Sequence, residues 1–429
     1  MRDWIWTAAS VVALISVVLA GEDFELVPAK LFHTRASLGN VFEKLKAGKD
    51  VRIAYFGGSI TAAPGWRVKT LKWFQEQYPK AKVSEINAAI GGTGSALGVY
   101  RFRQDVLQHK PDLIFVEFAV NDGGAQPDNI YRGMEGIIRQ AWKADPTIDI
   151  CYVYTFRVNY EKDLDKGLCP RAASADEKLA EYYDIPSINM AMRIAEMARD
   201  GRLIFVPKKD EQGKDLPAPE GVTLFSTDGV HPLVDTGHEI YLQVIADALK
   251  QMEPVSKPGP HELKAPFIAD NWENAKLVAL DPAMLSPGWE KLSATEGLGQ
   301  RFANRMPEIW EAAKPGEAIS FQFKGTAVSL YDLVGPDGGQ AVVTLDGETR
   351  KPVPRFDSYC SYHRISMMGI GQGLEDKVHT VKIEIHPDQP DRSSVTNREK
   401  DKPGFDQKKY DGTAMRVGGI LLMGNMVKE

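Results

Sequence analysis

A serine stands at the end of a short apolar run near the start of the chain. Val51 to Phe56 is rich in β-forming residues, and Gly57 and Gly58 end this run directly before Ser59. Glycines let the backbone bend without a Cβ clash, so the turn would present a hydroxyl where reactive groups collect, at the carboxyl end of a strand. The alternative is an ordinary turn in which Ser59 or Thr61 only caps the next helix.

An aspartate and a histidine stand three residues apart in Asp228-Gly229-Val230-His231, just before a long amphipathic segment. At this spacing the Asp228 carboxylate can fold back and accept the N–H of the imidazole, which leaves the other ring nitrogen as a base. The pair is therefore a candidate base with its orienting carboxylate. Taken alone, such a pair is more simply explained as a turn aspartate and a surface histidine before a proline.

Two further loops carry polar groups at expected strand ends. Asn87 leads into a glycine-rich loop that contains Gly91, Gly92 and Gly94, and its main-chain N–H groups could hold an anion. The spacing misses the G-x-G-x-x-G pattern of dinucleotide sites, and the Gly-Lys-Ser/Thr ending of a phosphate loop is missing. Asn121 opens an Asn-Asp-Gly sequence, which by itself is typical of a turn.

Short β-rich runs alternate with amphipathic helices from Val51 to about Met252, which predicts a parallel sheet covered on both faces. The expected strands are 51–56, 82–87, 113–118, 148–155 and 185–188. The expected helices are 66–78, 95–108, 129–144, 172–183, 190–199 and 234–252. This order predicts a three-layer α/β/α domain of the flavodoxin-like type.

The four polar stretches occur in an order that resembles the SGNH hydrolases, also called the GDSL esterase and lipase superfamily. That family carries a serine, a glycine, an asparagine and an Asp-x-x-His in four successive blocks. Here the blocks read F-G-G-S-I-T, N-A-A-I-G-G-T-G, A-V-N-D and D-G-V-H-P. The resemblance covers about half of the chain, and the combination is far more specific than any one block.

The resemblance implies a role for each matching residue. Ser59 would be the nucleophile, His231 the base, and Asp228 the group that orients His231. The oxyanion hole would consist of the N–H groups of Ser59 and Gly92 and the side-chain amide of Asn121. This chemistry needs no cofactor and no metal.

The chain departs from the family pattern at several positions. Gly58 replaces the aspartate of the family name, and Ile60-Thr61 replaces serine-leucine. Gly91 stands beside Gly92, so either N–H could serve; the distance from Asn87 favours Gly92. Four residues near these loops could shape the pocket, although packing or surface pairing is the simpler expectation for the first two: Trp66, Arg67, Thr93 and Arg101.

The first residues predict export. Trp4 to Ala20 is an apolar run behind Arg2, and its small residues suit a signal peptidase cut after Ala20, so we expect a signal peptide at 1–20 and a secreted or periplasmic protein. An uncleaved membrane anchor is the alternative, because the run is only slightly shorter than the roughly 20 residues that span a bilayer.

The second half of the chain has a different texture. We expect the SGNH domain at 21–252 and a proline-rich linker at 253–267. Short alternating runs then predict an antiparallel β-sandwich at 268–429, which resembles the jelly-roll domains attached to carbohydrate esterases. Its expected strands include 318–323, 327–331, 341–345, 378–385 and 417–423, and the charged stretch 389–409 is expected to be an exposed loop.

Composition narrows the function classes. The 429 residues carry a net charge of -6 and no concentrated basic face, which argues against nucleic acid as a partner. Three cysteines are too few for a disulfide framework and are not spaced as metal ligands, although export would permit a Cys151–Cys169 bridge.

These expectations together describe an exported serine esterase that removes O-acyl groups, above all O-acetyl groups, from carbohydrate. The expected partner is an acylated carbohydrate or another small ester, with no stable membrane association after signal cleavage. One alternative is a lipase, lysophospholipase or thioesterase for longer acyl chains, which would need a long apolar pocket or a lid. The other is a glycan-binding protein whose hydrolase domain is inactive.

Overall fold

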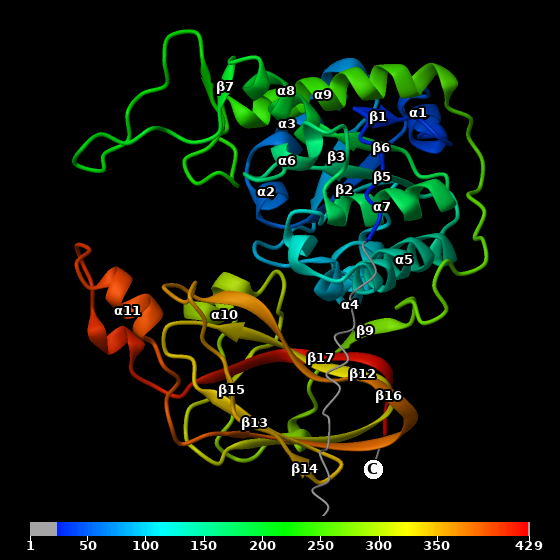
Figure 1. Cartoon of the computed structure of the whole chain (residues 1–429). Helices are drawn as coiled ribbons and strands as arrows, with labels where there is room; N and C mark the ends of the chain where they lie inside the picture. The colour runs from blue at the N-terminus through cyan, green and yellow to red at the C-terminus, as the bar shows by residue number, and fades with distance from the viewer. Residues whose placement is uncertain (1–23, 428–429) are drawn as a thin grey trace, which may run out of the picture.

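A six-stranded sheet lies at the centre of the first half of the computed structural model, which describes residues 24–427 (Figure 1). The strand order is β1-β6-β5-β4-β2-β3, in which the five strands from β6 to β3 are parallel and β1 is an antiparallel edge strand. The bounds are β1 (Phe32–His33), β2 (Val51–Gly57), β3 (Val83–Asn87), β4 (Leu113–Glu117), β5 (Asp149–Tyr154) and β6 (Ser187–Asn189). Numbered along the chain, the parallel strands follow the flavodoxin order 2-1-3-4-5, which confirms the predicted fold.

Helices cover both faces of this sheet (Figure 1). One core cluster packs under α1 (Gly39–Lys46), α3 (Trp66–Gln77), α8 (Met190–Arg199) and α9 (Gly237–Met252). The other packs under α4 (Ser95–Asp105), α5 (Pro127–Ala144) and α7 (Arg171–Tyr182). Strands β4 and β5 are buried along their whole length, which explains why they read as continuous apolar runs.

Short elements connect these layers. They are α2 (Ser59–Ala62), η1 (Leu107–His109), η2 (Asn121–Gly124), α6 (Glu161–Leu164) and η3 (Glu253–Val255). Between β7 (Leu203–Ile204) and β8 (Thr223–Leu224), residues 205–222 form an extension that projects from the domain (Figure 1). The sequence patterns did not predict α1, β1 or this extension.

The second half of the chain is an antiparallel sheet of nine strands, in agreement with the predicted all-β sandwich. Two long strands dominate it and bend with the sheet around a separate apolar core, so that Figure 1 shows two layers. The bounds are β9 (Ala275–Val278), β10 (Glu290–Lys291), β11 (Trp310–Ala312), β12 (Ala318–Val334), β13 (Gln340–Leu345), β14 (Glu348–Thr349), β15 (Val353–Pro354), β16 (Arg364–Ile385) and β17 (Met415–Met426).

Two expectations for this domain need correction. The runs 318–323 and 327–331 are one strand, β12, with a register shift between Gly325 and Ala327. The stretch 389–409 is not simply a loop, because it contains α11 (Ser393–Glu399) and part of η5 (Gln407–Tyr410). Three further short elements complete the domain: η4 (Pro282–Met284), α10 (Gly297–Phe302) and η5.

One apolar cluster contains residues from both halves of the chain, in addition to the separate core of the second half. The ring of Trp272, which precedes β9, lies tilted against that of Tyr100 in α4 with the centroids 5.9 Å apart, and the main-chain N–H of Trp272 donates to the carbonyl of Arg132 in α5 at 3.0 Å. The same apolar cluster includes Tyr331 of β12 and Leu421 of β17. The sheet domain is therefore packed directly onto the helical layer of α4 and α5.

The three cysteines are buried and unpaired, so no Cys151–Cys169 bridge is formed. Among residues 24–427, every helix is too short or too polar to cross a bilayer. Within the same residues, no group of three or more His, Cys, Asp or Glu side chains is arranged to hold a metal ion. The predicted signal peptide lies outside the described residues.

Candidate active site

Ser59, His231 and Asp228 are connected by hydrogen bonds at the carboxyl edge of the sheet. Ser59 is the first residue of α2, directly after β2, and its Oγ lies 2.7 Å from the Nε2 of His231. The Nδ1 of His231 lies 2.6 Å from the Oδ2 of Asp228. Because a carboxylate only accepts, Nδ1 carries the proton and Nε2 is left to accept from the serine hydroxyl. This arrangement can transfer a proton from Ser59 to His231.

Asp228 is held by the loop that it belongs to. Its Oδ1 accepts from the main-chain N–H groups of Val230 and His231 at 2.9 and 2.8 Å, and from the hydroxyl of Ser226 at 2.9 Å. Partial burial pushes the pKa of Asp228 upward, but these bonds and the one from the His231 ring outweigh it and hold the pKa well below its usual range. The carboxylate is therefore ionised and ready to stabilise a cationic His231.

The glycine-rich loop and the Asn121 loop both approach the serine turn. A Cβ on Gly58 would overlap the amide oxygen of Asn121, so this amide lies directly against the residue before Ser59. A Cβ on Gly91 would lie 3.5 Å from the Cβ of Ser59. Gly92 has a φ of +74° and nothing within 4 Å of where its Cβ would be, so this turn favours glycine and leaves its surroundings open.

A buried carboxylate, Glu117, lies beneath the serine turn and was not predicted. It ends β4 and accepts from the hydroxyls of Thr61 in α2 at 3.0 Å and Thr155 after β5 at 2.8 Å. Burial raises its pKa to about 7, and the neighbouring Asp122 adds to this, while the bonds from Thr155, Thr61 and the Gly58 N–H act in the opposite direction. The sequence signal that could have identified Glu117 is a single acidic residue at the end of the otherwise apolar run of β4.

Asp122, next to Asn121, is also buried and is more than a turn former. Its two carboxylate oxygens accept from the main-chain N–H of Ser95 at 3.1 and 3.2 Å, at the first residue of α4. Burial raises its pKa to about 6, partly offset by these bonds. Asp122 thus connects the asparagine loop to the end of the glycine-rich loop.

The four candidate pocket residues are buried and occupied elsewhere. Trp66 and Arg101 have no exposed surface, Thr93 donates to the carbonyl of Ile90 at 2.9 Å, and Arg67 forms an ion pair with Glu85. None of the four side chains is free to face a substrate. Arg67 and Arg101 instead donate to the main-chain carbonyls of Thr61 and Ala88.

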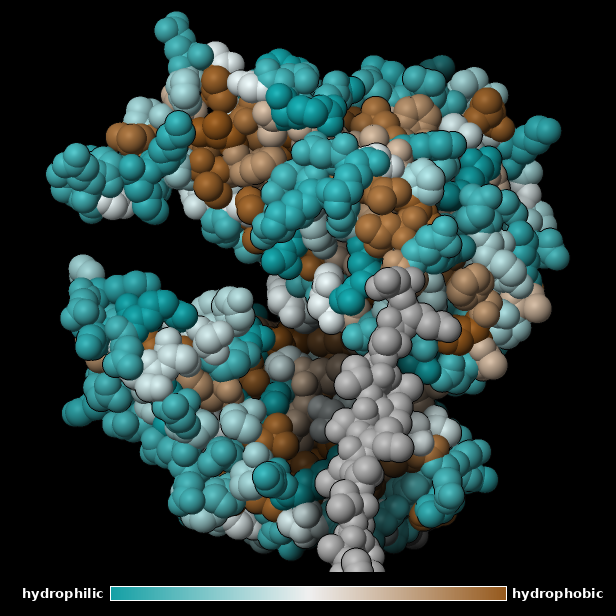
Figure 2. Space-filling model, viewed as in Figure 1, coloured by the Kyte–Doolittle hydropathy of each residue, from teal (hydrophilic) through white to brown (hydrophobic). Residues whose placement is uncertain are grey.

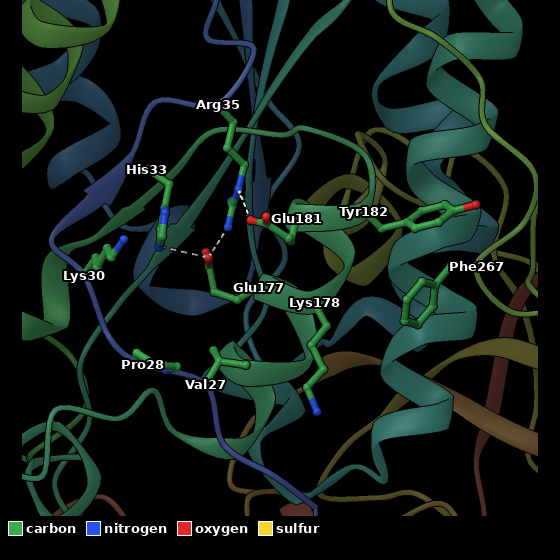
Figure 3. A pocket seen from close by; sticks show the side chains of 10 residues that line it. All are labelled: Val27, Pro28, Lys30, His33, Arg35, Glu177, Lys178, Glu181, Tyr182 and Phe267. Carbon is green, nitrogen blue, oxygen red and sulfur yellow. Dashed lines mark hydrogen bonds and ion pairs between the residues drawn. The ribbon is translucent and has the colours of Figure 1, made fainter.

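A cavity between the N-terminal segment and α7 lies away from these residues. It has a volume of about 560 Å³, and Arg35 and His33 face Glu177 there (Figure 3). Its lining contains none of the predicted site residues: Val27, Pro28, Lys30, His33, Arg35, Glu177, Lys178, Glu181, Tyr182 and Phe267. The serine site itself is open, since the side chains of His231 and Asp228 are 51% and 50% exposed.

An open cleft separates two extensions on one side of the molecule (Figure 2). The extension at residues 205–222 projects from the first domain, and the segment around α11 projects below it from the second. Helix α2, which begins with Ser59, lies on this same side of the first domain (Figure 1).

The fold and these contacts define an SGNH-type hydrolase domain. Residues 55–238 match the family model of the GDSL-like Lipase/Acylhydrolase family, in agreement with the resemblance that the four blocks carry. The class of activity is therefore that of an acyl ester hydrolase. None of the curated proteins matches the chain.

Solved structures of two-domain esterases share the whole architecture. An esterase (CEX) active on acetylated mannans is 20% identical, with a TM-score of 0.68 over 92% of this chain and 98% of its own. The same esterase co-crystallized with mannopentaose gives a TM-score of 0.68 at 19% identity over the same shares of both chains. The combination of a GDSL-like domain with an appended all-β domain is thus an architecture that other esterases have.

Proposed function

We propose that this chain is an exported serine esterase that hydrolyses O-acyl esters, above all O-acetyl esters, on carbohydrate. Ser59 attacks the ester carbonyl while His231 takes its proton, and Asp228 orients His231 and stabilises its cation. The alcohol leaves with the proton from His231, and water then hydrolyses the acyl-enzyme. The observation that carries this proposal is the continuous chain of hydrogen bonds, 2.7 Å from Ser59 to His231 and 2.6 Å from His231 to Asp228.

The oxyanion of the tetrahedral intermediate would accept from the N–H groups of Ser59 and Gly92 and from the amide of Asn121. The close approach of the Asn121 amide to Gly58, and of Gly91 to Ser59, supports this set. Donors that are fixed before the reaction stabilise charge that develops only in the transition state, so they raise the rate of the chemical step.

Two observations support a carbohydrate substrate. The half-exposed His231 and Asp228 suit an ester group carried on a polymer surface rather than a long acyl chain drawn into a tunnel. The whole-chain similarity to the esterase active on acetylated mannans points in the same direction. The Trp4–Ala20 run supports export to the outside or to the periplasm, where such glycans occur.

Hydrolysis of p-nitrophenyl esters from acetate to octanoate, and release of acetate from acetylated mannan, tests the proposal. We expect activity to fall steeply beyond acetate, acetate to be released from the polymer, and Ser59→Ala to abolish both reactions. Equal activity of wild type and Ser59→Ala would remove Ser59 as the nucleophile. A preference for octanoate would replace the carbohydrate substrate by a lipid-like one, and an inert wild type that binds glycan would favour the binding-protein alternative.

Asp228→Asn tests the orienting role. An asparagine keeps the shape but can present a donor where the Nδ1–H of His231 needs an acceptor, so we expect kcat to fall by on the order of 10³–10⁴-fold. The thermal midpoint should change little, because the side chain is half exposed. A kcat within a few-fold of wild type would contradict the role.

A further inference from the structure

The glycine-rich loop is held at its start by both domains. On the sheet side, the main-chain N–H groups of Ala88 and Ile90 donate to the carbonyls of Tyr55 and Gly57 in β2, each at 3.0 Å. The carbonyls of Asn87 and Ala88 each accept from an arginine. Two successive main-chain carbonyls that bind two guanidinium groups fix the direction in which the loop leaves β3.

One of these arginines comes from the same domain. Arg101 in α4 is fully buried and donates to the carbonyl of Ala88 at 2.6 Å and to the carboxylate of Asp105 at 2.7 Å. Its guanidinium also lies over the ring of Phe56, 4.5 Å from the centroid. This anchor belongs to the packing of α4 against β2.

The other arginine comes from the second domain. Arg305 follows α10, and its guanidinium donates to the carbonyl of Asn87, 218 residues earlier in the chain. The main-chain carbonyl of Arg305 accepts from the side chain of Gln104 in α4 at 3.0 Å. Arg305 is therefore bound to the first domain through both its guanidinium and its main-chain carbonyl.

The surroundings of the Arg305 guanidinium disfavour its positive charge. Burial lowers the pKa of Arg305, Asp105 acts against that effect, and Arg101 adds to it. Arg101 forms an ion pair with Asp105, the guanidinium of Arg305 lies near the same carboxylate, and the hydroxyl of Tyr331 in β12 is buried there with no hydrogen-bond partner. A largely buried cluster of this kind fixes one geometry, because each guanidinium must keep its carbonyl partner.

We infer that Arg305 of the second domain is a positioning residue for the glycine-rich loop, which carries the proposed oxyanion donor Gly92. The β domain would then support the chemical step, as well as any binding of glycan. The inference rests on the proposed function. The carbonyl of Asn87 lies four residues before Gly91, which faces Ser59, and five before Gly92. Loss of this anchor lets the loop rotate at its start, and displacement of an oxyanion donor by about 1 Å costs on the order of 100-fold in rate.

Steady-state kinetics on p-nitrophenyl acetate with the full-length chain test this role. The variants are Arg305→Met, which removes the guanidinium but keeps the chain length, and Arg305→Lys, which keeps one donor. Arg350→Met is the matched control, because Arg350 also donates to a main-chain carbonyl, that of Ile370, but both partners lie in the second domain. We expect Arg305→Met to lower kcat about 10- to 100-fold with KM within about threefold, Arg305→Lys to recover part of the loss, and Arg350→Met to match wild type.

The outcomes separate the inference from the proposed function. A folded Arg305→Met with wild-type kcat, or a loss confined to KM, overturns the positioning role while the esterase proposal stands. If Arg305→Met does not fold, Arg305→Lys decides the question: an unchanged kcat overturns the role, and a lowered kcat with unchanged KM supports it. If wild type and Ser59→Ala are equally inactive or equally active, the proposed function fails, and the positioning role fails with it.

Discussion

Glu117 is a buried acid that lies where the serine turn, β4 and the end of β5 meet. Burial raises its pKa from 4.5 to about 7, so the folded protein binds this proton more tightly than the unfolded chain does. Below about pH 4.5 the group is protonated in both the folded and the unfolded state, so its ionisation does not lower the free energy of unfolding. As the pH rises to about 7 the unfolded chain ionises first, so the stability of the fold falls across this window.

We therefore expect Glu117→Gln to flatten the pH dependence of stability. Each unit of pKa shift corresponds to about 1.4 kcal/mol, so the wild type should lose on the order of 3 kcal/mol relative to the variant between pH 4.5 and pH 8. Asp122, whose pKa is raised to about 6, acts in the same direction and remains in both proteins. Urea unfolding at several pH values measures this difference.

The control for this experiment is Glu220→Gln, which removes an exposed carboxylate from the 205–222 extension. Its unfolding free energy should follow the wild type at every pH. Parallel curves for wild type and Glu117→Gln would show that Glu117 does not titrate in this window.

At the residue scale, the sequence predicts what is carried by local spacing. Ser59, Asp228 and His231 stand in short blocks in a set order, and the structure places their side chains in hydrogen-bond contact, although their catalytic roles stay predictions. Glu117 and Arg305 were missed, because their importance depends on burial and on partners that are distant along the chain.

The serine turn needs two adjacent glycines because a different group lies close to each of them. A Cβ on Gly57 would lie 2.5 Å from the main-chain carbonyl of Glu117, which belongs to the sheet and cannot move cheaply. A Cβ on Gly58 would overlap the end of the Asn121 side chain, which can rotate away. The sequence suggested freedom to bend as the reason for both glycines, but Gly58 has a φ of -90°, and close approach is the actual reason.

The two alanine variants should therefore separate stability from rate. We expect Gly57→Ala to destabilise the fold by about 1–3 kcal/mol. Gly58→Ala should leave the thermal midpoint nearly unchanged and lower kcat about 100-fold, because it displaces the Asn121 amide. Thermal unfolding and kinetics on p-nitrophenyl acetate measure both effects. Wild-type kcat in Gly58→Ala would argue against a role for Asn121 in the oxyanion hole.

Among the larger elements, the spacing of apolar residues and the turn-forming residues between the runs predicted the five parallel strands and six main helices to within a few residues. The long strand β16 was half missed, since its first part carries methionines and glycines in place of a clear alternation. Helix α11 was missed because a charged, turn-rich sequence carries no helical period; it contributes only Val395 to a small core.

At the scale of the whole molecule, the packing of α4 and α5 against β9 joins the two halves. The side chain of Gln140 in α5 donates to the carbonyls of Trp272 and Ala275 at 3.4 Å each. The linker expected at 253–267 implies one core for each of the two domains, and these domain boundaries stay a prediction. The shared apolar cluster is a long-range property that no local pattern records.

We therefore expect the full chain to unfold in a single transition. Domains joined by a large apolar interface do not move independently, so loss of one exposes the core of the other. Scanning calorimetry should give one peak whose calorimetric and van't Hoff enthalpies agree. Trp272→Ala, which removes the ring beside Tyr100, should lower the temperature of that peak. Two separate peaks in the wild type would mean that the interface contributes little.

The unpaired cysteines have a practical consequence. Burial raises the pKa of Cys169 to about 12 and of Cys360 to about 11, and it raises the pKa of Cys151 as well. Thiols are attacked by oxidants and alkylating agents as thiolates, so these three stay inert while the protein is folded. Because none of the three is joined in a disulfide, the native state needs neither an oxidant nor a disulfide isomerase to form.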